Sequence, residues 1–341
     1  MISALGKKEK FFIGRARFFI RTGERTKKGG AYMKTYAPKY YRSFKCIADK
    51  CRRNCCIGWD IGIDEDTADY YSTVGGDIGE KLSRSVVCDG GEHSFRMCEG
   101  GRCPFLLPSG LCELICELGE ESLSDICREH PRFYNYVSDR EEVGVGLCCE
   151  AAADLILFGE DSSRPELLSE DSEDASLICD FDPTEDRDRL ISFFERAGHI
   201  GELLTEIARA RALEIPNAAE RVSILMAMPA MDRESYHELL SRVDTARVGG
   251  FTALDEQYKR LCSYLAYRHA SAAESEEDLK QAIGFIAFFA MTFIDVCESE
   301  KLTPENRDRI IHIATVLSSE IEYSPDNTEA IKSLFASNKR R

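Results

Sequence analysis

The feature that most constrains this chain is a dense run of cysteines between residues 46 and 59. Four thiols, those of Cys46, Cys51, Cys55 and Cys56, fall within eleven residues with the spacing C-x4-C-x3-C-C. Adjacent cysteines do not readily bond each other, so the partners of this run must come from elsewhere. Further cysteines follow in separate blocks: Cys103, Cys112, Cys127, Cys148 and Cys149. We expect most of these thiols to converge on one metal or iron–sulfur site.

The cellular compartment decides how so many cysteines are interpreted. The chain has 341 residues and 15 cysteines, and Arg15 and Arg17 interrupt its early apolar patches, so no signal peptide is predicted. Without export, clustered cysteines indicate metal ligands rather than disulfides. The longest apolar run, residues 282–293, is too short to span a bilayer. We therefore predict a cytoplasmic metalloprotein without membrane insertion.

The charge is distributed unevenly. The net charge is −16, but residues 1–32 carry nine Lys/Arg and two Glu, a balance of +7 that leaves −23 for the rest. An acidic body repels nucleic acid and attracts a lysine-rich partner. The alternative interpretation is that the acidic surface mainly aids solubility.

Hydrophobic periodicity predicts a mostly α fold with two lobes. We expect a basic leader at 1–32 that is non-native or disordered, with Met33 as the biological start. An irregular cysteine-rich lobe with few short strands follows at 33–158, then an acidic connector at 159–186 and an α-helical domain at 187–337. Asp64 is expected to cap a helix, whereas the glycine-rich stretch 75–102 predicts loops and a hairpin. The helices expected after the connector are 187–213, 217–228, 232–247, 252–270, 276–299, 304–322 and 326–337.

The spacing of the thiols leaves the metal open. Thiolates select zinc, copper(I) or iron–sulfur clusters over magnesium or calcium. Structural zinc sites usually show C-x2-C pairs, and this chain has none. A cubane cluster needs four thiolates and tolerates scattered positions. An iron–sulfur cluster, a zinc or mononuclear iron site, and ordinary thiols therefore all remain open. Trp59 is expected to pack over such a site, and His130 is either a ligand or a histidine at a turn.

The residues that carry these thiols resemble the flagellin lysine-N-methylase family. The likeness is firm over residues 33–158 and fainter in the helical half, at Tyr264-Leu-Ala-Tyr-Arg268. The matching blocks are 40–46 (YYRSFKC), 55–64 (CCIGWDIGID), 103–106 (CPFL), 110–112 (GLC), 118–120 (LGE), 127–134 (CREHPRFY) and 146–150 (GLCCE).

This resemblance implies methyl transfer from S-adenosylmethionine to lysine ε-amines of flagellin or a similar lysine-rich protein. It also implies a [4Fe–4S] cluster. The family cysteines correspond to Cys46, Cys51, Cys55, Cys56, Cys103, Cys112, Cys127, Cys148 and Cys149, and the first six ranked as cluster ligands are Cys51, Cys55, Cys56, Cys103, Cys112 and Cys127.

Methyl transfer requires a neutral lysine amine, and hence a nearby base or desolvation. Candidates for that base are Glu120, Glu150 and Tyr134, each beside a cysteine block, and candidates for contact with the methyl donor are Trp59 and Arg128. The alternative function is a non-catalytic zinc- or iron-chelating module. A redox carrier is a third interpretation.

Overall fold

The computed structural model describes residues 32–137, 140–174, 181–245 and 253–337, and the fold is mostly α. The described residues form two compact units, which we treat separately. Unit 1 comprises 47–130, and unit 2 comprises 32–46 and the residues from 131 onward. The expected leader at 1–32 lies outside the described residues except for Tyr32, which begins a strand.

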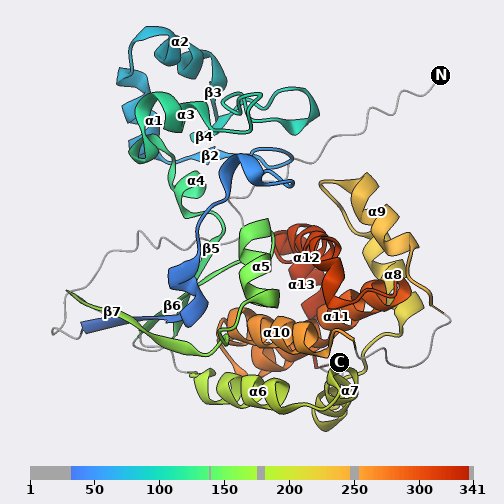
Figure 1. Cartoon of the computed structure of the whole chain (residues 1–341). Coiled ribbons are helices and arrows are strands. Elements are labelled where there is room, and N and C mark those ends of the chain that lie inside the picture. Colours follow the sequence, from blue (N-terminus) through green and yellow to red (C-terminus); the bar gives the residue numbers. More distant parts are fainter. Residues whose placement is uncertain (1–31, 138–139, 175–180, 246–252, 338–341) are drawn as a thin grey trace. The chain divides into compact units, whose positions relative to one another are not determined.

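Unit 1 joins short elements through long loops, shown in blue and green in Figure 1. A small antiparallel sheet has the order β2-β4-β3. The elements are β2 (Gly62–Ile63), α1 (Glu65–Thr73), α2 (Gly76–Ser85), β3 (Val86–Asp89), β4 (Glu92–Phe95), α3 (Glu113–Leu118) and α4 (Asp125–Glu129), with one-turn 3₁₀ segments at Ala48–Lys50, Glu99–Gly101 and Glu120–Ser122.

A small apolar core holds unit 1 together. Its buried members are Ile61, Ile63, Tyr71, Leu82, Phe95, Cys103, Phe105, Leu106 and Leu114. Asp64 caps α1 by accepting a hydrogen bond from the Thr67 N–H at 2.9 Å, and its other oxygen accepts from the Asp125 N–H at 2.9 Å. One carboxylate therefore starts α1 and also fixes the start of α4.

Unit 2 contains a four-stranded sheet with the order β5-β6-β1-β7, in which β1 and β6 are parallel and the other pairs antiparallel. The chain thus joins its first described strand to strands far along the sequence. The strands are β1 (Tyr32–Pro38), β5 (Arg132–Val137), β6 (Arg140–Val145) and β7 (Pro165–Asp174), and a 3₁₀ segment at Lys39–Ser43 follows β1.

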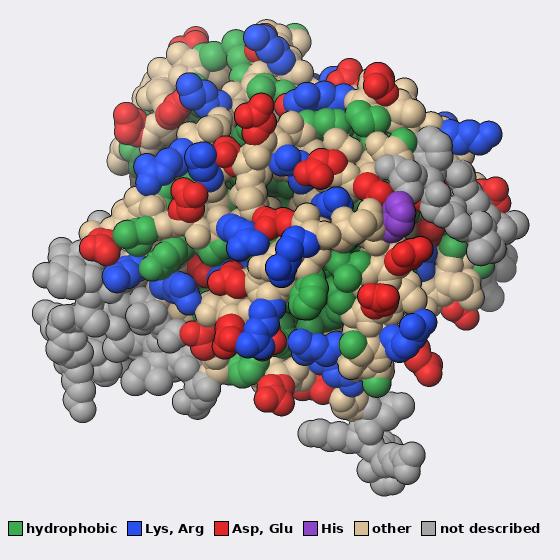
Figure 2. Space-filling model, turned by 60° about the horizontal axis from the view of Figure 1, so that its bottom comes forward, with side chains coloured by type: hydrophobic (Ala, Val, Ile, Leu, Met, Phe, Trp, Pro, Cys, Tyr) green, Lys and Arg blue, Asp and Glu red, His purple; other side chains and the backbone are tan. Residues whose placement is uncertain are grey.

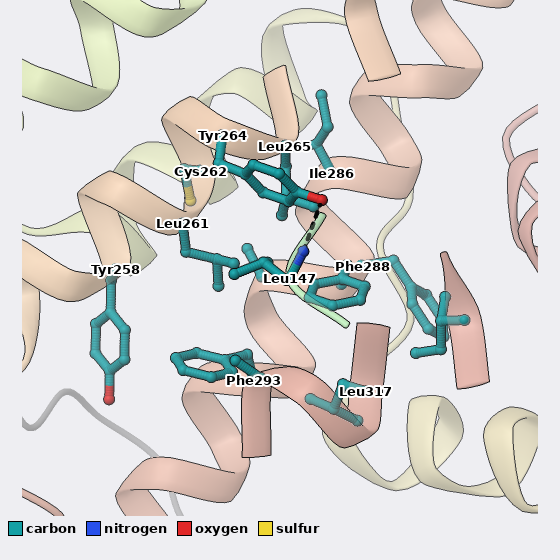
Figure 3. Packing of buried hydrophobic residues seen from close by; sticks show 14 of the residues in the cluster. Leu147, Tyr258, Leu261, Cys262, Tyr264, Leu265, Ile286, Phe288, Phe293 and Leu317 are labelled. Atoms are coloured by element: carbon teal, nitrogen blue, oxygen red, sulfur yellow. Dashed lines mark hydrogen bonds between the residues drawn. The ribbon is translucent and has the colours of Figure 1, made fainter. Parts of the chain in front are cut away.

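Helices make up the rest of unit 2, and α11 runs through its core. The buried faces of α10, α11 and α12 bring Leu261, Phe288 and Leu317 together, as Figure 3 shows. The helices are α5 (Glu150–Phe158), α6 (Thr184–Arg196), α7 (Ile200–Ala210), α8 (Ala218–Ala227), α9 (Arg233–Ser241), α10 (Asp255–Leu265), α11 (Glu276–Ser299), α12 (Arg307–Ile321) and α13 (Pro325–Ser333), with a π-helical turn at Ala266–Ala270 and a 3₁₀ segment at Pro304–Asn306.

The sequence predicted most of these helices, and the structure differs from the prediction in three places. The expectation of no helix within 75–102 was wrong, because α2 forms there and buries Leu82. The prediction of an acidic connector over residues 159–186 was also wrong in part, because β7 pairs with β1 over residues 165–174. The helix expected over 187–213 is divided into α6 and α7, which are separated at residues 197–199.

A buried ion pair ties the sheet of unit 2 to its helices. Arg187 on α6 and Glu142 on β6 are both fully buried. Arg187 Nη1 donates to Glu142 Oε2 at 2.6 Å, and Nη2 donates to Oε1 at 3.0 Å. Arg187 Nη1 also donates to Ser271 Oγ at 2.6 Å. A two-pronged pair of this kind satisfies both buried charges.

Replacing Arg187 should therefore destabilise the protein strongly. Arg187→Leu removes the two-pronged partner of buried Glu142 and leaves only the more distant Arg140, whose Nε lies 3.8 Å from Glu142 Oε1. We expect a loss of about 3–5 kcal/mol in urea unfolding. Replacing both partners by leucine should recover much of that loss. The control is Arg189→Leu, which removes an exposed pair on the same helix and should cost less than about 1 kcal/mol. Equal losses for the two single variants would contradict this account.

Candidate functional site

Five cysteines from four separate stretches lie together in unit 1: Cys55, Cys56, Cys103, Cys112 and Cys127. All five are free thiols. Short backbone contacts explain how they meet. The Cys103 N–H donates to the Cys56 carbonyl at 2.8 Å, and Cys112 pairs with Leu106 in an isolated β-bridge.

The thiols influence one another's proton affinity. Burial raises the pKa of Cys103 to about 11 and that of Cys127 to about 12, and it also raises the pKa of Cys112. The pKa of Cys56 is raised chiefly by its hydrogen bond to Cys55, and the same hydrogen bond lowers the pKa of Cys55. Thiols with raised pKa values release protons when they bind a soft metal.

The donor chemistry of this cluster fits a soft metal. Cys103 is buried, Cys56, Cys112 and Cys127 pack against the apolar core, and Cys55 is exposed. Neighbouring thiols in a partly desolvated site are the ligand type that iron–sulfur clusters and zinc require. Within the described part of the chain, however, no group of three or more His, Cys, Asp or Glu side chains has the arrangement of a metal's ligands. Binding would therefore require the side chains to turn toward a common centre.

The other predicted metal ligands fall elsewhere. Cys51 is in unit 1, where its Sγ lies 3.1 Å from the Arg53 carbonyl. Cys46 ends the first segment of unit 2, and Cys148 and Cys149 precede α5 in unit 2. The nine cysteines of the resemblance are thus divided between the two units.

The residues expected beside the metal in unit 1 are Trp59, His130 and Arg128. Trp59 is buried, and its ring centroid lies 6.3 Å from that of His130. Burial lowers the pKa of His130 to about 4, which keeps the imidazole neutral at pH 7. Arg128 on α4 is exposed and pairs with Asp125 at 2.5 Å.

The three predicted bases do not share a unit. Glu120 is exposed and lies in the 3₁₀ segment after α3 of unit 1. Tyr134 lies on β5, and Glu150 is the buried first residue of α5, both in unit 2. Glu150 therefore sits at a helix N-terminus, a position that favours a carboxylate.

Unit 2 also holds a buried polar network that the sequence did not predict. It centres on Glu322, whose side chain is fully buried. His269 Nε2 lies 2.8 Å from Glu322 Oε1, and Tyr264 Oη donates to the same oxygen at 3.1 Å. Arg268 Nη1 donates to Tyr264 Oη at 2.8 Å, and its guanidinium stacks on the Tyr323 ring. Arg268 and His269 lie in the π-helical turn, a feature that is frequent at functional sites.

This network anchors the turn that carries Cys148. The Leu147 N–H donates to Tyr264 Oη at 3.3 Å, the bond dashed in Figure 3. Tyr323 Oη donates to the Pro131 carbonyl at 2.9 Å and hydrogen-bonds Cys148. A Cβ on Gly146 would lie 2.0 Å from Tyr323 Oη, so a side chain at residue 146 would displace the Tyr323 ring. The blocks at 131–134, 146–150 and 264–268 therefore meet within unit 2.

The surface offers no concentrated charge on the face shown in Figure 2, where acidic and basic side chains are interspersed. A shallow open depression on α6 is lined by both signs, including Glu185, Arg189 and the half-exposed ring of Phe193. Among the described helices, α11 alone is long and apolar enough to cross a membrane, and most of it is buried inside unit 2.

No family model, curated protein or solved structure matches the chain.

The buried histidine of the network predicts a pH dependence of stability. Burial lowers the pKa of His269 from 6.5 to about 4. Between those values the unfolded chain takes up a proton that the folded chain excludes, so the free energy of unfolding should fall as pH falls from about 6.5 to 4, by up to about 3 kcal/mol. In urea titrations His269→Gln should flatten this slope. Exposed His199 supplies the control, and an unchanged slope in His269→Gln would refute the assignment.

Proposed function

We propose that this chain is a protein lysine N-methyltransferase that uses S-adenosylmethionine and holds a [4Fe–4S] cluster in unit 1. One observation carries the proposal. Cysteines of four resemblance blocks, far apart in the sequence, are neighbours in unit 1. Ligands of one metal centre must come together in the fold, and the nearness of these thiols supports that role.

A second set of observations supports the assignment of the remaining blocks. Tyr264 and Arg268, from the fainter part of the likeness, contact the turn at 146–149 and the strand that begins after Pro131. Segments that match the family in sequence are therefore joined by hydrogen bonds within unit 2. The finer two-lobe arrangement belongs to the same proposal, with unit 1 as the cysteine-rich lobe and unit 2 as the helical one.

Methyl transfer to a lysine amine places three requirements on the protein. A lysine amine must lose its proton, the neutral nitrogen must face the sulfonium methyl, and water must be excluded. The nitrogen–carbon bond forms as the carbon–sulfur bond breaks, and the proton on the methylated amine passes to a base. Glu150 and Tyr134 in unit 2, and Glu120 in unit 1, are the proposed candidates for that base. When bound, the cluster supplies either an anchor for the amino and carboxylate groups of S-adenosylmethionine or a structural tie between loops.

The test combines metal content, donor binding and methyl transfer on the same anaerobic sample. We expect about four irons and four sulfides per chain, saturable binding of S-adenosylmethionine, and incorporation of deuterated methyl groups into flagellin lysines, read by mass spectrometry. Flagellin with acetylated lysines is the matched control and should gain no methyl groups.

These outcomes distinguish a methyltransferase from a metal-chelating module, both of which would hold a metal through the thiols of unit 1. Bound zinc without sulfide, donor binding or methyl transfer would overturn the methyltransferase and leave a metal-chelating module. A sulfide-containing cluster with donor binding but no transfer to flagellin would instead redirect the search to another lysine-bearing protein.

A further inference from the structure

The outer face of α6 in unit 2 carries a stripe of side chains that is complementary to itself. The stripe lines the shallow depression described above and consists of Glu185, Asp188, Arg189, Ser192, Phe193 and Arg196. We propose that this stripe is the contact surface for a second copy of the chain, through two antiparallel α6 helices related by a two-fold axis. The proposal depends neither on a metal nor on methyl transfer.

The spacing of the stripe stays the same when the direction of the helix is reversed. After Glu185 the other members follow 3, 4, 7, 8 and 11 residues later, so all of them lie on one side of an α-helix. Counted backwards from Arg196, the intervals are the same. Two antiparallel copies can therefore match the stripe along its whole length, with Glu185 of each copy opposite Arg196 of the other.

The charges of the stripe favour the antiparallel arrangement. Two of its side chains are acidic and two are basic, so it carries no net charge, whereas the whole chain carries −16. Two copies can therefore approach through this face without the repulsion expected between two acidic surfaces. An antiparallel pair sets an acid against a base at both ends, whereas a parallel pair would set Glu185 against Glu185.

The charges nearer the middle of the stripe have partners within one copy. Arg187 Nε donates to Asp188 Oδ1 at 2.7 Å, and Arg189 pairs with Glu185 one turn earlier. The side chain of Glu185 is nevertheless 77% exposed. Its carboxylate therefore has room to accept from a second cation, which the proposal identifies as Arg196 of the other copy.

Phe193 supplies the apolar part of the contact. It is 54% exposed, more than any other large apolar residue in the described part of the chain, whereas its neighbour Phe194 is 1% exposed and belongs to the core of unit 2. In the antiparallel pair the two Phe193 positions are offset by five residues, about 8 Å along the helix axis. Each ring would then cover part of the opposite helix and lose contact with water.

The size of the contact limits its strength. Interfaces at the low end of the size range are weak and transient, and one pair of helices gives a small interface. Its ion pairs also lie at the surface, where salt screens them. We therefore expect a monomer–dimer equilibrium that shifts with protein concentration and weakens at high salt.

Sedimentation velocity of the full chain tests the proposal. A reductant is kept present, because the free thiols of the chain could otherwise form disulfide-linked dimers. The parent chain should shift from monomer to dimer as its concentration rises, and Phe193→Ala should weaken the association by about tenfold. The control is Leu334→Ala at the end of α13, which removes another exposed apolar side chain and should leave the association unchanged.

Charge reversal tests the antiparallel arrangement. Glu185→Arg sets arginine against arginine at both ends, and Arg196→Glu sets glutamate against glutamate. Each variant alone should associate about tenfold more weakly than the parent chain, or more weakly still. An equimolar mixture of the two variants restores opposite charges at both ends and should form a heterodimer. The double variant Glu185→Arg/Arg196→Glu should dimerise with itself for the same reason.

Three results would overturn the proposal. The first is a parent chain that stays monomeric at every concentration. The second is an association that Phe193→Ala and the two charge variants leave unchanged. The third is a loss of association in both charge variants that their mixture does not reverse. Far-ultraviolet circular dichroism of each variant separates loss of association from loss of folding.

Discussion

The apolar core of unit 1 is small, and cysteines lie in it and against it. A few side chains around Phe105 and Leu82 form that core, and four of the five neighbouring cysteines belong to it or pack against it. Small cores rarely stabilise a fold alone, and metal binding then becomes part of the folding free energy. The loops between α2 and α4 are long and rich in glycine, so cross-linking them through one centre would restrict many residues at once.

In unit 2 the corresponding feature is a buried carboxylate, that of Glu322, which is shared by several hydrogen-bond donors. Glu322 accepts from Tyr264 and lies beside His269 and Arg268. Burial raises the pKa of Glu322, but the Arg268 charge and the hydrogen bonds of His269 and Ser318 together outweigh burial and lower that pKa. Such networks are stabilising only when every member is satisfied. The network around Glu322 connects the end of α12, the π-helical turn and the turn that carries Cys148.

The sequence predicted what periodicity and local chemistry determine. The expected helix 276–299 matches α11, because its apolar residues are continuous and Ser275 caps it. Sequence reasoning missed α2, because Gly76 and Gly79 indicated loops, whereas the burial of Leu82 favours a helix. Five of the predicted cysteines, Cys55, Cys56, Cys103, Cys112 and Cys127, neighbour one another in unit 1, and their role as metal ligands stays a prediction. Glu322 was missed, because a single acidic residue in a helical run looks like any exposed one until burial shows its partners.

X-ray absorption at the iron and zinc edges of the chain purified without oxygen tests the central claim most directly. The account predicts iron with a first shell of sulfur and a second shell of neighbouring iron, as in a thiolate-bound cluster. Zinc surrounded by sulfur alone would keep the thiol centre and exclude the cluster. A first shell of oxygen or nitrogen would contradict the account, because the neighbouring thiols of unit 1 would then not supply the metal ligands.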